Sequence, residues 1–106
     1  MDKKVTVRTL LRKKQRGKKI TMVSTYDYLS AKLCDEVGID AILVGDSLGM
    51  VFKGEPNTLG VTLEEIIYHT KAVKRGAKRA FVIADMPFGS YQVSVEQGLE
   101  LSLIHI

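Results

Sequence analysis

The sequence predicts an α/β fold in which helices cover a parallel sheet, and two observations lead to it. From residue 20 onward, short runs of apolar and β-prone residues alternate with segments that have helical spacing. The expected strands are apolar throughout, as in strands whose two faces are both covered. The repeat is βαβαβα after an N-terminal helix, which is typical of a doubly wound sheet or of part of a (β/α)-barrel.

The N-terminal arm, residues 1–19, carries the basic character of the chain. It holds nine Lys and Arg and one acidic residue, a net charge of +8. Residues 20–106 hold seven Lys and Arg and eleven acidic residues, a net charge of −4, so the whole chain has a net charge of +4. A short amphipathic helix is expected from residue 6. Charge alone gives only nonspecific attraction to nucleic acid, and the arm lacks aromatic residues that could stack on bases. We therefore expect a solvated helical face and no nucleic-acid partner.

The first strand–helix unit spans residues 20–38. A β-prone run at 20–25 is followed by a helix expected over 26–37, and Gly38 ends that helix in the usual C-terminal position. The helix is predicted from apolar residues at helical spacing, namely Leu29, Leu33 and Val37.

The second and third units repeat the pattern. A strand is expected at 41–45 and a long loop containing Gly and Pro at 47–61. Thr62 and Glu65 have the spacing of a capping box, which satisfies free amides at a helix start. That helix should close at Gly76 and bury Ile66, Ile67, Thr70 and Val73. The next strand is expected at 80–84, and a second capping box, Ser94 to Gln97, should open a helix through Leu99 and Leu103.

Size and composition indicate part of a globular protein. The 106 residues are 45% hydrophobic and 26% charged, which is ordinary for such a protein. Three parallel strands cannot close a barrel and would leave unpaired edges, so we expect the front portion of a larger protein rather than a compact three-strand domain. No apolar stretch reaches the ~20 residues that span a bilayer, and no secretory signal is visible, so no membrane partner is expected. The single cysteine, Cys34, excludes an internal disulfide and fits a reducing cytoplasm.

Two acidic residues follow matching strands. The stretches are AILVGDSLG (41–49) and AFVIADMPFG (80–89), so Asp46 and Asp85 each follow apolar residues and one small residue. If the strands are parallel neighbours, both carboxylates emerge at the carboxyl edge, where ligands bind in such sheets. Close carboxylates repel unless one is protonated or a cation lies between them, and Mg²⁺ suits such a pair. Spacing alone leaves open that both acids hydrogen-bond nearby loop amides instead.

Among the other polar residues, Ser47 could take part in binding, whereas the rest are expected mainly to pack. Ser47 could donate its hydroxyl or amide to an anionic substrate group. His69 has no Cys or Asp partner at helical spacing, so a surface or packed histidine is favoured over a metal ligand. Cys34 is expected to be a buried structural thiol. Tyr26 and Tyr91 follow strands and could line a pocket or simply pack.

Four segments resemble a known family: KITMVSTYDYLSAKLCDEVGID, ILVGDSLGMVFKG, NTLGVTLEEIIYHTKAVKRGA and VIADMPFGSYQVS. They have the order and spacing of the ketopantoate hydroxymethyltransferase family from about residue 19 to residue 100. The resemblance implies a (β/α)₈ TIM barrel, of which residues 1–106 are the N-terminal part with the first three βα units. It also implies that Asp46 and Asp85 bind Mg²⁺ and that, with Ser47, they bind substrate, Ser47 contacting the carboxylate of the 2-oxo acid.

The implied activity transfers a one-carbon unit from 5,10-methylenetetrahydrofolate to 3-methyl-2-oxobutanoate, giving 2-dehydropantoate for pantothenate synthesis. The implied enzyme is a cytoplasmic homo-oligomer. Beyond residue 100 the family supplies a substrate-binding Lys, a third acidic group and a glutamate base, so the isolated chain is expected to be inactive. The ending at 101–106, LSLIHI, does not resemble the family's third helix, which favours a truncated or frame-shifted end, and Gly60 replaces the family's usual Pro.

Two alternatives remain at this point. One is another Mg²⁺-dependent barrel enzyme acting on 2-oxo acids, of the phosphoenolpyruvate mutase or isocitrate lyase kind, which uses similar carboxylates at strand ends. The other is a noncatalytic fragment whose basic arm binds an anionic partner.

Overall fold

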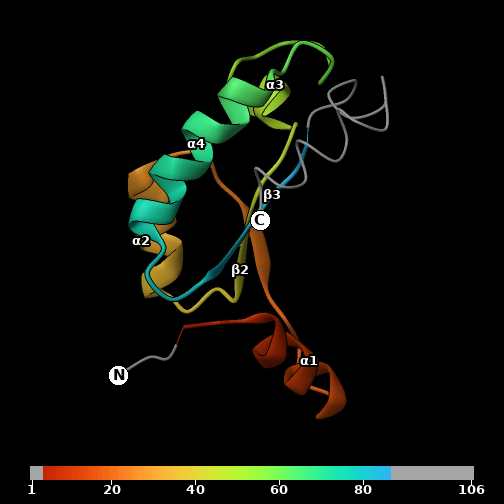
Figure 1. The fold of residues 1–106 in the computed structure, drawn as a ribbon, viewed down its shortest axis with the longest axis vertical. Helices are drawn as coiled ribbons and strands as arrows, with labels where there is room; N and C mark the ends of the chain where they lie inside the picture. The colour runs from red at the N-terminus through yellow and green to blue at the C-terminus, as the bar shows by residue number, and fades with distance from the viewer. Residues whose placement is uncertain (1–3, 87–106) are drawn as a thin grey trace.

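A computed structural model of the chain describes residues 4–86 of its 106 residues (Figure 1). Its centre is a three-stranded parallel sheet in the order β1 (Met22–Ser24), β2 (Ala41–Val44) and β3 (Phe81–Ala84). Chain order and sheet order therefore coincide. The predicted α/β class with a parallel sheet is confirmed for this part of the chain.

Two helices cover one face of the sheet. α2 (Tyr28–Glu36) and α4 (Leu63–Gly76) pack side by side there, and each connects one strand to the next (Figure 1). The helices come very close, because a Cβ on Gly76 would lie 2.5 Å from the Tyr28 carbonyl oxygen. Glycine at this position therefore sets the distance between the two helices.

The predicted helix boundaries rest on local hydrogen bonds. The Thr62 hydroxyl accepts from the Glu65 amide, and the Glu65 carboxylate accepts from the Thr62 amide, so the predicted capping box of α4 is present. Gly38 has φ +91°, the left-handed conformation expected of a residue that follows a helix end. The second capping box predicted at 94–97 lies outside the described residues.

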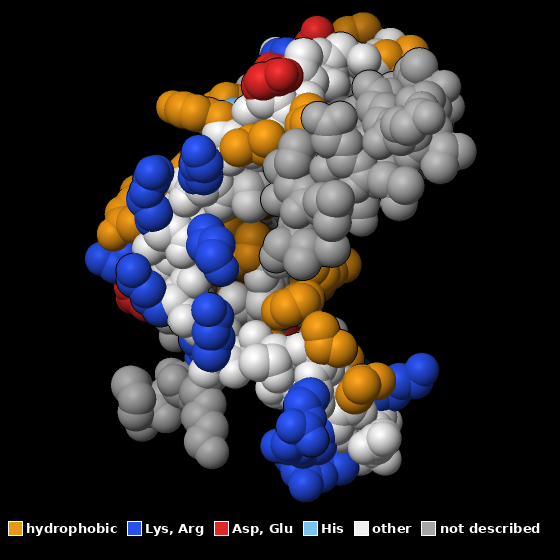
Figure 2. All heavy atoms as spheres, viewed as in Figure 1, with side chains coloured by type: hydrophobic (Ala, Val, Ile, Leu, Met, Phe, Trp, Pro, Cys, Tyr) orange, Lys and Arg blue, Asp and Glu red, His pale blue; other side chains and the backbone are white. Residues whose placement is uncertain are grey.

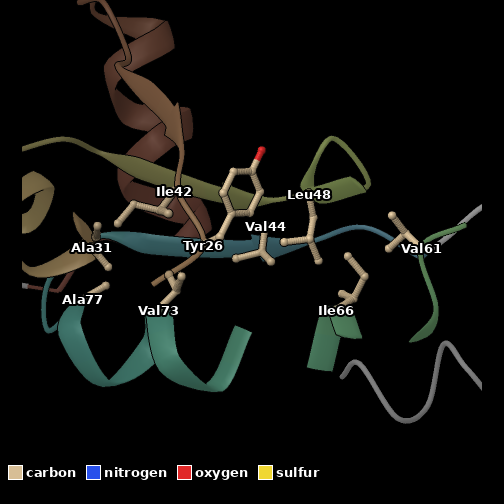
Figure 3. Close-up of a cluster of buried hydrophobic side chains, with 10 residues drawn as sticks. Tyr26, Ala31, Ile42, Val44, Leu48, Val61, Ile66, Val73 and Ala77 are labelled. Atoms are coloured by element: carbon tan, nitrogen blue, oxygen red, sulfur yellow. The ribbon is translucent and has the colours of Figure 1, made fainter. Parts of the chain in front are cut away.

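The core lies between the sheet and the two helices (Figure 3). Ile42 and Val44 of β2 point toward the helices and are fully buried, and so are Ile66 and Val73 of α4. Tyr26, between β1 and α2, adds its ring to this cluster. Strand residues alternate between faces, so Leu43 lies on the face away from the helices.

Two predictions about individual segments need correction. The helix over 26–37 is present as α2, but its apolar residues Leu29, Leu33 and Val37 are exposed, whereas Ala31 packs into the core. The loop at 47–61 contains a short helix, α3 (Leu48–Val51), because the amides of Leu48 and Gly49 bond back to the carbonyls of Gly45 and Asp46 while Leu48 is fully buried.

The N-terminal helix α1 (Val7–Gln15) lies at the end of the sheet where the strands begin (Figure 1). It has no buried residue, as expected of a solvated basic helix. Its Lys13 ammonium nevertheless donates to Asp40 at 2.7 Å, and Asp40 also accepts from Thr21. Figure 2 shows Lys and Arg side chains over α1 and along the face formed by α2 and α4. None of the helices within residues 4–86 is long and apolar enough to cross a membrane.

Candidate functional site

Asp46 and Asp85 lie together at the carboxyl edge of the sheet. Asp46 follows β2 by two residues, and Asp85 directly follows β3. The Asp85 amide donates to the Val44 carbonyl at 3.1 Å, which extends the ladder past the last strand residue. A Cβ built on Gly45 would lie 2.9 Å from Oδ2 of Asp85. The Asp85 carboxylate therefore lies over the residue that precedes Asp46.

The strand register differs by one residue from the match of the two sequence stretches. That match places Asp46 opposite Asp85, whereas the structure pairs Val44 with Ala84, so that Gly45 lies opposite Asp85. The absence of a side chain at Gly45 leaves the space that the Asp85 carboxylate occupies. The offset therefore gives a physical reason for glycine at this position.

The electrostatics of the pair fit a cation. Partial burial and the like charge of Asp46 raise the pKa of Asp85 above its ordinary value of 3.8. Within residues 4–86 neither carboxylate has a hydrogen bond or an ion pair. Two neighbouring carboxylates without a cationic partner among the described residues supply the oxygen ligands that a hard divalent cation prefers, and a bound cation would relieve their repulsion. No group of three or more His, Cys, Asp or Glu side chains is gathered in the described part, so the pair would supply two protein ligands of such a site.

Ser47 lies beside the acidic pair and is held by Tyr26. Its Oγ lies 2.5 Å from the Tyr26 hydroxyl oxygen. Ser47 stands at the N-cap of α3, yet its side chain makes no capping hydrogen bond. The sequence left the role of Tyr26 open between lining a pocket and packing; the structure gives it a buried ring, 7% exposed, and a polar contact at this edge.

Thr25 adds a polar group that the sequence did not single out. It follows β1 at the same edge, its residue is 8% exposed, and its hydroxyl is buried without a hydrogen-bond partner among the described residues. A buried hydroxyl without a partner is costly, so we expect its partner to lie outside the described residues. Only its burial could have revealed it, because Thr is common in strands.

His69 and Cys34 belong to the packing and not to the acidic pair. The His69 Nδ1 lies 2.7 Å from the Tyr26 carbonyl oxygen, and its ring packs edge-on against Phe52, so the packed histidine is confirmed. Cys34 is half-buried against the core, and less enclosed than the expected buried thiol. Tyr91 lies outside the described residues.

Comparison with known proteins places these residues in a family. The family model described as ketopantoate hydroxymethyltransferase matches residues 4–104. Relatives named 3-methyl-2-oxobutanoate hydroxymethyltransferase include those of Aquifex aeolicus, 75% identical over 96 residues, Clostridium botulinum, 58% over 97, and Pyrococcus abyssi, 54% over 98.

Each match covers 91% or 92% of this chain, but 36%, 35% and 34% of the respective relatives. The chain thus spans about a third of the length of these relatives. The family match, and not the carboxylates at the strand ends, separates the chain from enzymes of the phosphoenolpyruvate mutase or isocitrate lyase kind, which the sequence had left open. The family model covers nearly the whole sequence, and the chain therefore belongs to the ketopantoate hydroxymethyltransferase family.

Proposed function

We propose that the chain is the N-terminal part of an enzyme that transfers a hydroxymethyl group from 5,10-methylenetetrahydrofolate to 3-methyl-2-oxobutanoate, giving 2-dehydropantoate for pantothenate synthesis. The observation that carries the proposal is the convergence of Asp46 and Asp85 at one sheet edge in a chain of this family. The 2-oxo acid has a ketone and a carboxylate on adjacent carbons, which together can chelate a metal held by such a pair.

Asp46 and Asp85 would hold Mg²⁺ and leave other coordination positions open for the 2-oxo acid. When bound, the metal would act as a Lewis acid that stabilises the negative charge developing on the ketone oxygen as the neighbouring carbon loses its proton. Ser47 would donate to the substrate carboxylate and fix its orientation. The nucleophilic carbon would then bond to the folate methylene carbon as one of its two C–N bonds breaks. Water would supply the hydroxyl oxygen as the second C–N bond breaks. Tetrahydrofolate would leave with one proton on each nitrogen, one from the 2-oxo acid and one from water.

The complete enzyme would be a (β/α)₈ TIM barrel. Two apolar surfaces support this architecture. The exposed face of α2 carries Leu29, Leu33 and Val37, and the sheet face away from the helices carries Met22 and Leu43. Further strand–helix units could cover both surfaces. We further propose that the enzyme is a homo-oligomer in the cytoplasm whose partners are the two small substrates, and neither nucleic acid nor membrane.

The transferase proposal is tested in a full-length chimera. This chain replaces the segment that it matches in the Aquifex aeolicus relative, and 75% identity makes the exchange mild. Formation of 2-dehydropantoate that requires both Mg²⁺ and 5,10-methylenetetrahydrofolate is the expected result. An inactive chimera beside an active parent would overturn the proposal. The isolated chain should show no turnover, because the family resemblance implies a catalytic base beyond residue 100, and a rate above a matched blank would contradict this expectation.

The metal site is tested separately with Mn²⁺ as a paramagnetic substitute for Mg²⁺. The double variant Asp46→Asn, Asp85→Asn of the chimera should lose the bound-Mn²⁺ signal in electron paramagnetic resonance and should have no activity. Glu64→Gln is the matched control, because Glu64 is an exposed acid on α4. Undiminished Mn²⁺ binding by the double variant would show that the metal lies elsewhere.

A further inference from the structure

The Tyr26 hydroxyl is held rigidly at the edge of the candidate site. Its ring packs within the buried cluster, and the residue is 7% exposed. Figure 3 shows the hydroxyl pointing away from the helix that carries Val73. The Tyr26 carbonyl is fixed as well, because the His69 Nδ1–H donates to it at 2.7 Å from α4. Ring and backbone are thus anchored independently, which leaves the hydroxyl little freedom.

The partner of this hydroxyl is Ser47 Oγ, at 2.5 Å. Serine at a helix N-cap ordinarily accepts from an amide two or three residues later. Ser47 makes no such bond, because its backbone is helical, with φ −57° and ψ −14°, and its side chain is hydrogen-bonded to Tyr26 instead. The local rule is broken where the side chain stands next to Asp46. Such departures are expected where a side chain serves a site.

The direction of this hydrogen bond decides what Ser47 can do. A hydroxyl has one proton to donate. If Ser47 donated it to Tyr26, a lone pair would face any anion at the site. If Tyr26 donates, the Ser47 proton is free for an anionic ligand, and the chain of two hydrogen bonds becomes mutually strengthening. A phenol is also the more acidic of the two hydroxyls and hence the better donor.

We propose that Tyr26 is a positioning residue that orients the Ser47 hydroxyl to donate to the carboxylate of the 2-oxo acid. The inference rests on the proposed function and deepens it. Tyr26 acts only through Ser47, so its contribution must vanish when Ser47 has no hydroxyl. Its hydroxyl is hydrogen-bonded to Ser47 and not to the carboxylate of Asp46 or Asp85, so metal binding must not depend on it.

The experiment is a double-mutant cycle in the full-length chimera, with Tyr26→Phe, Ser47→Ala and the two combined. Phenylalanine keeps the buried ring and removes only the hydroxyl. The readouts are the dissociation constant of 3-methyl-2-oxobutanoate in the presence of Mg²⁺ and, separately, Mn²⁺ affinity. Tyr28→Phe is the matched control, because Tyr28 is 48% exposed and two residues away.

Tyr26→Phe should weaken binding of the 2-oxo acid roughly threefold to tenfold, the range of one neutral hydrogen bond. In the Ser47→Ala background the same change should have no effect, and Mn²⁺ affinity should be unaltered throughout. Equal losses in both backgrounds would indicate a merely structural role and overturn the inference. So would unchanged binding by Tyr26→Phe while the unmutated chimera is active. An unmutated chimera that neither binds nor turns over the 2-oxo acid would overturn the proposed function, and this inference with it.

Discussion

Replacing Gly45 with alanine should weaken metal binding without unfolding the chain. The new Cβ would lie 2.9 Å from Asp85 Oδ2, whereas ordinary contacts begin at 3.4 Å, so the carboxylate must move by 3.4 − 2.9 = 0.5 Å. Asp85 is exposed, and the clashing atom is the far end of its side chain, so the movement costs little folding free energy. Metal–ligand distances, however, tolerate only about 0.2 Å. We expect a loss of metal affinity of roughly tenfold, the lower end of the range for displaced ligand support.

The assay is the Mn²⁺ dissociation constant of the Gly45→Ala chimera, with its melting temperature measured alongside. A nearly unchanged melting temperature with weaker Mn²⁺ binding is the expected pair of results. Gly60→Ala is the control, because there too the nearest atom to an added Cβ is a carboxylate oxygen, that of Glu55 at 3.2 Å. Unchanged Mn²⁺ affinity in Gly45→Ala would refute the assignment of Asp85 as a ligand in this position.

Three further predictions concern stability. Gly76→Ala should lower the free energy of unfolding by about 2 kcal/mol, because the added Cβ would lie 2.5 Å from the Tyr28 carbonyl oxygen. Urea unfolding measures this loss, and Lys74→Ala, at an exposed position of the same helix, is the control. Asp35→Ala should cost roughly 1–3 kcal/mol, because its carboxylate accepts from the amides of Lys78, Arg79 and Ala80; Glu36→Ala is the control, and equal urea midpoints would contradict the prediction. Asp40 is buried, which alone raises its pKa, but hydrogen bonds from Lys13 and Thr21 outweigh burial and lower the pKa below 3.8. Its stabilising contribution is therefore present above pH 3.8 and lost as pH falls through the folded pKa, so wild type should lose more stability than Asp40→Asn in acid urea titrations.

The fold of the described part could be predicted because its signals are local. Apolar runs give the strands, and the Thr62–Glu65 box and Gly38 mark helix ends through hydrogen bonds within a few residues. The burial of α2 could not be predicted in this way. Its most apolar face, Leu29 and Leu33, is exposed, since the packing face is set by how closely α4 approaches through Gly76.

The site could be predicted only in part. The spacing placed Asp46 and Asp85 at one edge, because parallel strands end together. It did not give the one-residue register offset, which depends on pairing between segments 39 positions apart. The Tyr26–Ser47 contact could not be predicted from the sequence either, because a serine before a helix is ordinarily expected to cap that helix.

The two edges of the sheet differ in how their polar groups are satisfied. At the edge where strands begin, Asp35 accepts from three amides and Asp40 from Lys13 and Thr21. At the opposite edge, Asp46 and Asp85 repel each other without partners in residues 4–86, and the Thr25 hydroxyl is buried without one. If the unsatisfied polar groups were only packing defects, we would expect them at both edges of the sheet. Acids that serve the fold are paired within it, whereas the two left unpaired together support the proposal that a cation and an anionic substrate bind at this edge.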